Sequence, residues 1–329
     1  MNADRISVVR PLVISASRAT DIPAFHFEWL INRLKAGHCL WQNPFNAAQK
    51  QRVSFERARA IVFWSKNPAP LMPFLPEISA LGYQFYFQFT LNNYEGTGLE
   101  PRLPSLAQRI ETFKRLSDQI GPERVIWRYD PIILGTGLYI QNTLERIEAI
   151  GREIAPYTEK LVFSFVDMYQ KTQRELRSLA PTLSAPTREE ALLLAKGISD
   201  VARTLPGRLH LATCAEDLEL EDLGIDHNRC IDPDLLRHLC PDCAEFQTAS
   251  ASSVPQGTQA SLPGMPLQAV NTRSAKDKGQ RKACGCVPSK DIGAYSTCFH
   301  LCAYCYANKS RERIWANMRG IDPHSEALG

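Results

Sequence analysis

Short strand-like segments alternate with longer helix-like segments along most of this chain. Six runs are rich in β-branched and aromatic residues, and each is followed by polar residues and then by a stretch with helical spacing. Apolar residues repeat every three or four positions in PRLPSLAQRIETFKRLSDQIG and TREEALLLAKGISDVARTL, so we expect helices there. The six runs are PLVISASR from Pro11, AIVFWSKNP from Ala60, YQFYFQFTLNN from Tyr83, RVIWRYDP from Arg124, KLVFSFVD from Lys160 and RLHLATCAED from Arg208.

Strands that alternate with helices predict a parallel sheet. Six such units in about two hundred residues predict a partial β/α barrel of the TIM type over residues 1–245. In such folds, functional groups gather at the C-terminal ends of the strands, although any one polar residue there is equally explained as a cap or turn residue. The candidates at these ends are Ser15, Arg18, Asp21, Ser65, Lys66, Asn67, Thr90, Asn92, Asn93, Arg128, Asp130, Ser164, Asp167, Cys214 and Glu216.

The composition changes after the last strand-helix unit. Residues 246–283 are rich in Ser, Thr, Gln, Pro and Gly and carry the charged string RSAKDKGQRK. Too few apolar residues remain there to offset the entropy of ordering, so we expect a flexible connector. Residues 284–329 then form a cysteine-rich segment that ends in a predicted helix.

The overall charge is close to neutral and decides little about partners. The chain has 329 residues, enough for one large domain with an appendage, and its net charge of +3 marks neither a nucleic-acid nor a membrane-surface binder. The N-terminal apolar run is too short for a signal-peptide core, and no apolar segment approaches membrane-spanning length, so we expect a cytoplasmic protein. Ten cysteines in that reducing compartment predict metal or redox chemistry rather than disulfides.

The string TCFHLCAYCYAN holds the densest group of candidate ligands. In it, Cys298, Cys302 and Cys305 have the spacing C-x3-C-x2-C. Three thiolates on one short loop can bind three irons of a 4Fe-4S cluster and leave the fourth iron open for a small molecule to chelate. The spacing therefore favours a catalytic cluster over an electron carrier.

Two other metal sites remain open for these cysteines. A structural zinc site pairing Cys302 and Cys305 with Cys240 and Cys243 would leave Cys298 without a role. A fully ligated electron-transfer cluster would need a fourth nearby thiolate, such as Cys284 or Cys286.

Four further cysteines form a second candidate group. If the C-terminal segment folds back over the barrel mouth, these thiolates can gather into an auxiliary site that holds iron-sulfur or zinc. The alternative is that Cys214 and Cys230 are buried free thiols, as we expect for Cys39. The group consists of Cys214, Cys230, Cys284 and Cys286.

The strings CGCVPSKDIGAYSTCFHLCAYCYAN, VIWRYDP, VFWSKNP and TLNNYE together resemble a "domain of unknown function" family whose C-terminal cysteines match the cluster loop of radical S-adenosylmethionine (SAM) enzymes. The part-barrel layout is similar, more distantly, to that of spore photoproduct lyase. The resemblance implies a cluster whose open iron binds the amino and carboxylate groups of SAM, a 5′-deoxyadenosyl radical that attacks an unknown substrate, and an electron donor such as a flavodoxin or ferredoxin.

The position of the cysteines departs from that superfamily. Radical SAM barrels usually carry the cluster loop after the first strand, where this chain reads SASRATDIPAFH without a cysteine. We therefore expect a permuted partial barrel, in which residues 284–329 return to the barrel mouth and pack beside the first strand.

The resemblance also implies sites for SAM, whose ammonium needs an acceptor and whose carboxylate needs a donor. By strand position, Ser65, Lys66 and Asn67 fall where the superfamily contacts this head group. Arg128 and Asp130, with Ser164 on the next strand, fall where the carboxylate and ribose are held. Arg128 with Asp130 is equally explained as an internal ion pair. Tyr304, Phe299 and Tyr306 either shield the cluster or simply pack. We expect cofactor contacts from Ser65, Lys66, Asn67, Arg128 and Ser164, and catalytic roles for Arg18, Asp21 and Asp130.

Two functions follow from these observations. The first is a radical SAM enzyme of unknown substrate. The second is a non-catalytic α/β protein that binds zinc and mediates contacts with a partner or a nucleic acid through the basic strings KDKGQRK and KSRER. The modest net charge makes nucleic acid the less favoured partner.

Overall fold

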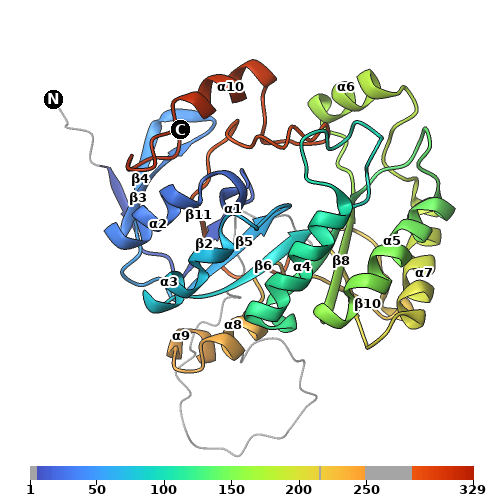
Figure 1. Ribbon diagram of the computed structural model, residues 1–329, viewed down its shortest axis with the longest axis horizontal. Helices are drawn as coiled ribbons and strands as arrows, with labels where there is room; N and C mark the ends of the chain where they lie inside the picture. The colour runs from blue at the N-terminus through green and yellow to red at the C-terminus, as the bar shows by residue number, and fades with distance from the viewer. Residues whose placement is uncertain (1–5, 215, 249–283) are drawn as a thin grey trace, which may run out of the picture.

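The computed structural model describes residues 6–214, 216–248 and 284–329. Its centre is an eight-stranded sheet in which every neighbouring pair is parallel, in the order β10-β9-β8-β7-β6-β5-β2-β11 (Figure 1). All six predicted strands are confirmed, and β10 and β11 form the edges. The strands are β2 (Val13–Ala16), β5 (Ala60–Ser65), β6 (Gln84–Thr90), β7 (Val125–Ile132), β8 (Lys160–Phe165), β9 (His210–Thr213), β10 (Ile225–His227) and β11 (Lys290–Asp291).

Helices connect the successive strands, so the expected parallel α/β fold is confirmed. That the sheet is a partial barrel of the radical SAM type remains a prediction. Both helices expected from apolar periodicity are present, and each begins with a capping box, from Ser105 with Gln108 and from Thr187 with Glu190. The helices along the sheet are α1 (Ile22–Phe25), α2 (Phe27–Ala36), α3 (Leu75–Ala80), α4 (Leu106–Ile120), α5 (Ile140–Ile154), α6 (Gln170–Leu179) and α7 (Arg188–Thr204), with short 3₁₀ turns at Met72–Phe74, Pro122–Arg124, Ala155–Tyr157 and Glu221–Leu223.

Side chains of the sheet alternate between two buried faces. Ile61 and Phe63 of β5 belong to the large apolar core under the helices, whereas Val62 between them packs on the other face. That second face is covered by α8 (Pro233–Leu239) and α9 (Ala244–Thr248), which lie together at the lower end of the view in Figure 1. On this face, the polar side chains that line a cavity lie at the C-terminal ends of the strands.

A small second sheet was not expected from the sequence. It has the order β1-β4-β3, in which β3 (His38–Asn43) and β4 (Asn46–Ser54) form an antiparallel hairpin and β1 (Ser7–Val9) pairs with β4. Most of β4 is exposed and polar, so its sequence lacks the apolar alternation that would have marked a strand. In Figure 1 the predicted terminal helix, α10 (Arg311–Arg319), lies above this hairpin.

The C-terminal segment returns to the first strand of the main sheet. β11 pairs with β2 in parallel, with Lys290 opposite Ile14 and Asp291 opposite Ser15. The end of the chain is tied to β3 of the small sheet, because Leu40 N–H donates to the carbonyl of Glu326 at 2.8 Å. Of the predicted connector, residues 246–248 belong to α9 and residues 249–283 lie outside the described part of the chain.

No helix in the described ranges is both long and apolar enough to cross a membrane. The longest, α7, has 17 residues and carries charged side chains along its length.

Candidate functional site

A cavity of about 510 Å³ opens at the C-terminal ends of the main strands, a size typical of small-molecule sites. The C-terminal ends of the main-sheet strands from β2 to β10, with the loops that follow them, form one part of its wall. The C-terminal segment forms another part. Arg18, Asp21, Lys66, Arg128 and Asp130 all line it, as predicted from their places after the strands. Seven of the ten cysteines also line it: Cys214, Cys230, Cys284, Cys286, Cys298, Cys302 and Cys305.

The loop that carries Cys298, Cys302 and Cys305 is tightly folded. Cys305 N–H donates to the carbonyl of Cys302 at 3.1 Å, and Leu301 has a φ of 58°, a left-handed conformation that is uncommon for a leucine. Asn308 Nδ2 donates to the carbonyl of Cys298 at 3.2 Å and closes the base of the loop. The chain thus holds an unfavourable backbone conformation between the first two thiols.

The carboxylate of Asp21 fastens this loop to the strand ends. It accepts hydrogen bonds from Ser65 Oγ at 2.8 Å, from Lys66 N–H at 2.8 Å and from Ala24 N–H at 3.0 Å at the start of α1, and it contacts His300 Nε2 at 2.7 Å. Its oxygens are therefore fully used in joining β2, β5 and the cysteine loop. Through these contacts Asp21 and Ser65 hold the loops of the site in position.

The thiols of this loop are partly buried, and Cys298 is provided with backbone donors. Burial raises the pKa of the Cys298 thiol to about 12, with Asp21 adding to the rise and the backbone N–H groups of His300 and Asp21 opposing it. Burial likewise raises the pKa of Cys302 well above its usual range, against the opposing charge of Lys66. N–H groups directed at sulfur are typical of metal-bound thiolates, whose charge they stabilise.

Within residues 6–214, 216–248 and 284–329, no three His, Cys, Asp or Glu side chains are arranged so that they could hold a metal ion as they stand. A cubane differs from a single ion, because each thiolate binds a different iron and the sulfurs need not converge on one point. The chemistry of the donor set fits a cubane: Cys298, Cys302 and Cys305 share one cavity wall and lie within electrostatic reach of one another.

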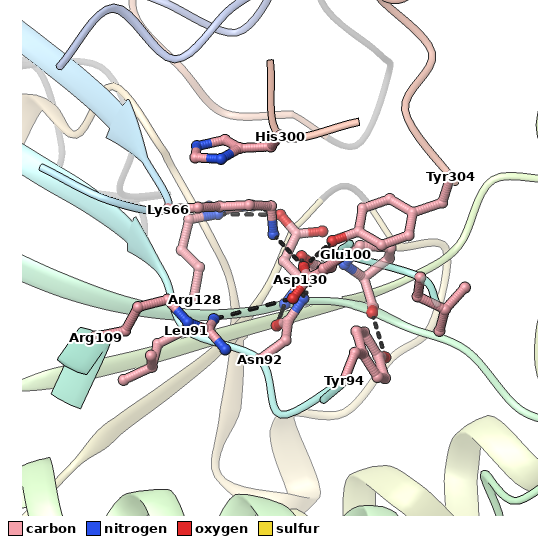
Figure 2. A network of polar contacts seen from close by, with 12 residues as sticks. Lys66, Leu91, Asn92, Tyr94, Glu100, Arg109, Arg128, Asp130, His300 and Tyr304 are labelled. Carbon is pink, nitrogen blue, oxygen red and sulfur yellow. Dashed lines mark hydrogen bonds and ion pairs between the residues drawn. The ribbon is translucent and has the colours of Figure 1, made fainter. Parts of the chain in front are cut away.

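Glu100 is the centre of a buried network that the sequence did not reveal. Figure 2 shows Lys66, Asn92 and Tyr304 pointing toward its carboxylate. Lys66 Nζ donates at 2.8 Å and Asn92 Nδ2 at 3.3 Å, the Tyr304 hydroxyl donates as well, and Arg109 lies 3.9 Å away. The network ties the loop after β5 to the cysteine loop through Tyr304.

The charges in this network stabilise one another. Burial alone would raise the pKa of Glu100, but the positive charges of Lys66 and Arg109 outweigh it and hold that pKa below its usual value. Burial alone would lower the pKa of Lys66, but Glu100 and then Cys302 outweigh it and raise it. Lys66 is therefore charged and faces both the carboxylate and a cysteine of the loop.

Arg128 and Asp130 form the ion pair that was one of the two interpretations of this strand. Arg128 Nε donates to Asp130 Oδ2 at 3.0 Å, and the Ser164 hydroxyl donates to the other carboxylate oxygen. Burial would raise the pKa of Asp130, but Arg128 and Ser164 together hold it below its usual value. Arg128 Nη1 also reaches Gln88 Oε1 and Cys230 Sγ, each at 3.2 Å. The pair therefore links the floor of the cavity to the second group of cysteines.

That second group is brought together by three stretches of chain. Cys214 follows β9, Cys230 follows β10, and Cys284 and Cys286 begin the C-terminal segment. The sulfurs of Cys214 and Cys230 lie 3.4 Å apart, and Cys286 lies within electrostatic reach of both Cys230 and Cys284. The four cysteines all line the cavity, as predicted. That they bind a metal or an iron-sulfur cluster remains a prediction.

Other candidates lie elsewhere. Asn67 borders a neighbouring hollow of about 410 Å³ rather than the main cavity. Cys240 and Cys243 pack in the apolar cluster around α8 and α9, outside the cavity lining, and Cys39 is buried as expected. Tyr304 and Tyr306 line the cavity, whereas Phe299 packs edge-on against Trp315.

Three positioning residues were missed for different reasons. Glu100 stands alone in a loop of Gly and Pro, and nothing local marks a buried carboxylate. Asp291 contacts residues more than 270 positions away. His300 lies inside the cysteine loop itself, where a polar residue between two ligands was the available signal.

A family model with the description "Domain of unknown function (DUF1848)" matches residues 13–307, from the first strand of the main sheet to just beyond the cysteine loop. No curated protein and no solved structure shows a significant match to this chain. The resemblance to a domain-of-unknown-function family is thus confirmed, whereas the likeness to spore photoproduct lyase is not shown.

Proposed function

The chain belongs to the DUF1848 family, and we propose that it is a radical SAM enzyme whose cluster is held by Cys298, Cys302 and Cys305. The observation that carries the proposal is the placement of these cysteines. They reach a cavity at the C-terminal ends of a parallel sheet, beside the loops that follow β2 and β5, from the far end of the chain. A structural metal loop would need no cavity in front of it.

When bound, a 4Fe-4S cluster with SAM on its open iron would supply the electron that cleaves the sulfonium and yields a 5′-deoxyadenosyl radical for hydrogen abstraction. Cys298, Cys302 and Cys305 would hold the other three irons. The N–H groups of His300 and Asp21 stabilise the charge on Cys298. The remaining side chains would orient the cofactor and keep water out.

The cavity offers partners for both ends of the SAM head group. Lys66 lies within electrostatic reach of Cys302, so its ammonium suits the carboxylate of SAM. Asp130 and Ser164 line the same cavity and offer oxygen atoms to the ammonium and the ribose hydroxyls. Ser65 is occupied by Asp21, so its role is to shape the loop that presents Lys66.

The experiment is anaerobic reconstitution of the full chain with iron and sulfide, followed by metal and labile-sulfide analysis. Replacing Cys298 by Ala should lower both by about four per chain, as loss of one cubane requires. Replacing Cys39 by Ala, which alters a buried thiol outside the cavity lining, should leave both unchanged. Zinc bound without labile sulfide, and unaffected by the Cys298 change, would overturn the proposal.

A further inference from the structure

Four further thiols line the cavity besides the triad of Cys298, Cys302 and Cys305. They are Cys214 after β9, Cys230 after β10, and Cys284 and Cys286 at the start of the C-terminal segment. The Cys214 and Cys230 sulfurs lie 3.4 Å apart, and Cys286 Sγ accepts from the N–H of Ile231, the residue next to Cys230. Cys284 lines the same cavity as these three. Three segments that are distant in sequence thus bring four cysteines to one cavity. We propose that Cys214, Cys230, Cys284 and Cys286 are the four thiolate ligands of a second metal centre on the wall of the same cavity.

Hydrogen-bond donors directed at these sulfurs carry the argument. Cys230 Sγ accepts from Arg128 Nη1 at 3.2 Å and from Asn228 Nδ2 at 3.2 Å, and Cys286 Sγ accepts from the backbone N–H of Ile231 at 3.3 Å. A neutral thiol is a weak acceptor and packs well among apolar groups, so it has no need of these donors. A metal-bound thiolate does need them, because its partners orient it and balance its charge.

A second cation points to the same group of sulfurs. Arg18 lies over the ring of Trp64, 4.7 Å from its centroid. The thiols of Cys230 and Cys286 lie within electrostatic reach of its guanidinium group. Its buried Nη2 atom has no hydrogen-bond partner in the part of the chain that the structure describes. Four thiolates around a divalent ion carry a net charge of about −2, which Arg18 and Arg128 together would offset.

The spacing of the sulfurs bears on the kind of metal. As they stand, the four are not arranged around a common centre. Binding would replace S–H contacts with metal–sulfur bonds and draw the sulfurs round one point. Four bonds of about 2.3 Å place the ligands of a tetrahedral zinc ion about 3.8 Å apart, close to the contact already made by Cys214 and Cys230. A cubane would require the sulfurs to separate further.

The position of the site gives it a structural consequence. Cys214 and Cys230 follow β9 and β10 at one end of the main sheet. Cys284 and Cys286 open the segment that continues through β11 to Cys298, Cys302 and Cys305. A metal bound to all four would clamp that segment across the open side of the sheet. It would do so whether or not the triad binds a cluster, so the inference stands independently of the proposed function.

The test uses the full chain with all three triad cysteines changed to Ser, expressed with zinc and iron in the medium and purified anaerobically. We expect this variant to retain metal: either about one zinc, or iron with labile sulfide, which would identify the centre as a cluster. Adding Cys230→Ser should remove it, and adding Cys240→Ser, which alters a buried thiol outside the cavity, should not.

A second measurement guards against misfolding of the Cys230 variant. Cys284→Ser lies at the start of the segment, outside the sheet, and should lower metal content equally while the circular dichroism of the sheet is kept. In the triad variant, the four thiols should also resist alkylation until a chelator is added. Triad-variant protein that carries no thiol-bound metal, or metal that survives both the Cys230 and the Cys284 changes, would overturn the inference.

Discussion

Replacing Asp291 by Ala should release the C-terminal segment from the first strand of the main sheet. The Asp291 carboxylate accepts hydrogen bonds from Ser15 Oγ at 2.6 Å, Ser17 Oγ at 2.7 Å, Arg18 N–H at 2.8 Å and Gly293 N–H at 2.9 Å. It is thus the main polar link between β11 and the loop after β2. Because β11 leads directly into the cysteine loop, the same carboxylate sets where the triad lies.

The expected cost follows from which donors water can reach. Ser15 and Ser17 are buried, with exposed fractions of 0% and 3%, so each hydroxyl would lose the acceptor for its O–H. Ser17 Oγ would keep only the hydrogen bond that it accepts from Ala19 N–H at 2.8 Å. Each hydrogen bond to a charged group contributes about 1.5–3 kcal/mol, and the two buried ones together give about 3–6 kcal/mol. Such a loss is a large part of the 5–15 kcal/mol that is usual for a folded domain, so the variant should be markedly unstable.

The assay is urea unfolding of metal-free protein under reducing conditions, which removes any contribution from bound metal. Asp291→Asn keeps one acceptor oxygen and should fall between the wild type and Asp291→Ala. Asp200→Ala removes a carboxylate from an exposed ion pair and should cost less than about 0.5 kcal/mol. Hydrogen exchange should quicken first in residues 290–307. If Asp291→Ala lies within 1 kcal/mol of the wild type, the segment is held by other contacts and the reasoning is wrong.

Two further predictions concern the same framework. A Cβ at Gly293 would lie 1.9 Å from Ser17 Oγ, so Gly293→Ala should destabilise the protein by about 1–3 kcal/mol in urea unfolding. Gly320→Ala, whose Cβ meets nothing closer than 3.6 Å, should have little effect. Equal unfolding midpoints for the two variants would contradict the close approach at Gly293. The pKa of Glu100 is lowered in the fold from 4.5, so its stabilisation is complete above pH 4.5 and is lost as pH falls below that value. Urea unfolding between pH 7 and pH 3 should therefore show a weaker pH dependence for Glu100→Gln than for the wild type, and identical slopes would refute the buried network.

The sequence was sufficient for the six inner strands of the main sheet, β2 and β5 to β9, because they are largely buried on both faces, but not for the edge strands β10 and β11. Each inner strand therefore reads as a short apolar run with polar residues at its end, and the alternation with helices requires parallel strands. The hairpin of β3 and β4 was missed because it is largely exposed and polar, so its residues carry no burial signal. Strand edges and exposed ribbons are decided by tertiary contacts that no local pattern records.

Site residues near the ends of predicted strands could be located from the sequence. Site residues whose role depends on contacts between distant segments could not. Arg128 and Asp130 could be placed because they lie in the C-terminal part of a strand, and the alternative of an internal ion pair was visible in their spacing. Glu100 and Asp291 could not be placed, since their importance comes from partners in other parts of the fold. Sequence spacing identified the cysteines, but only the fold shows that seven of them share one cavity.

Cleavage of SAM by the reduced protein tests the central claim most directly. The full chain, reconstituted anaerobically and reduced with dithionite, should convert SAM to 5′-deoxyadenosine, measured by liquid chromatography. Cys298→Ala should reduce the product to the level without protein, and Cys39→Ala should not. Formation of 5′-deoxyadenosine that depends on Cys298 is the result that the account predicts. Reconstituted protein with a full complement of iron and sulfide that forms no 5′-deoxyadenosine, or forms it equally without Cys298, would contradict it.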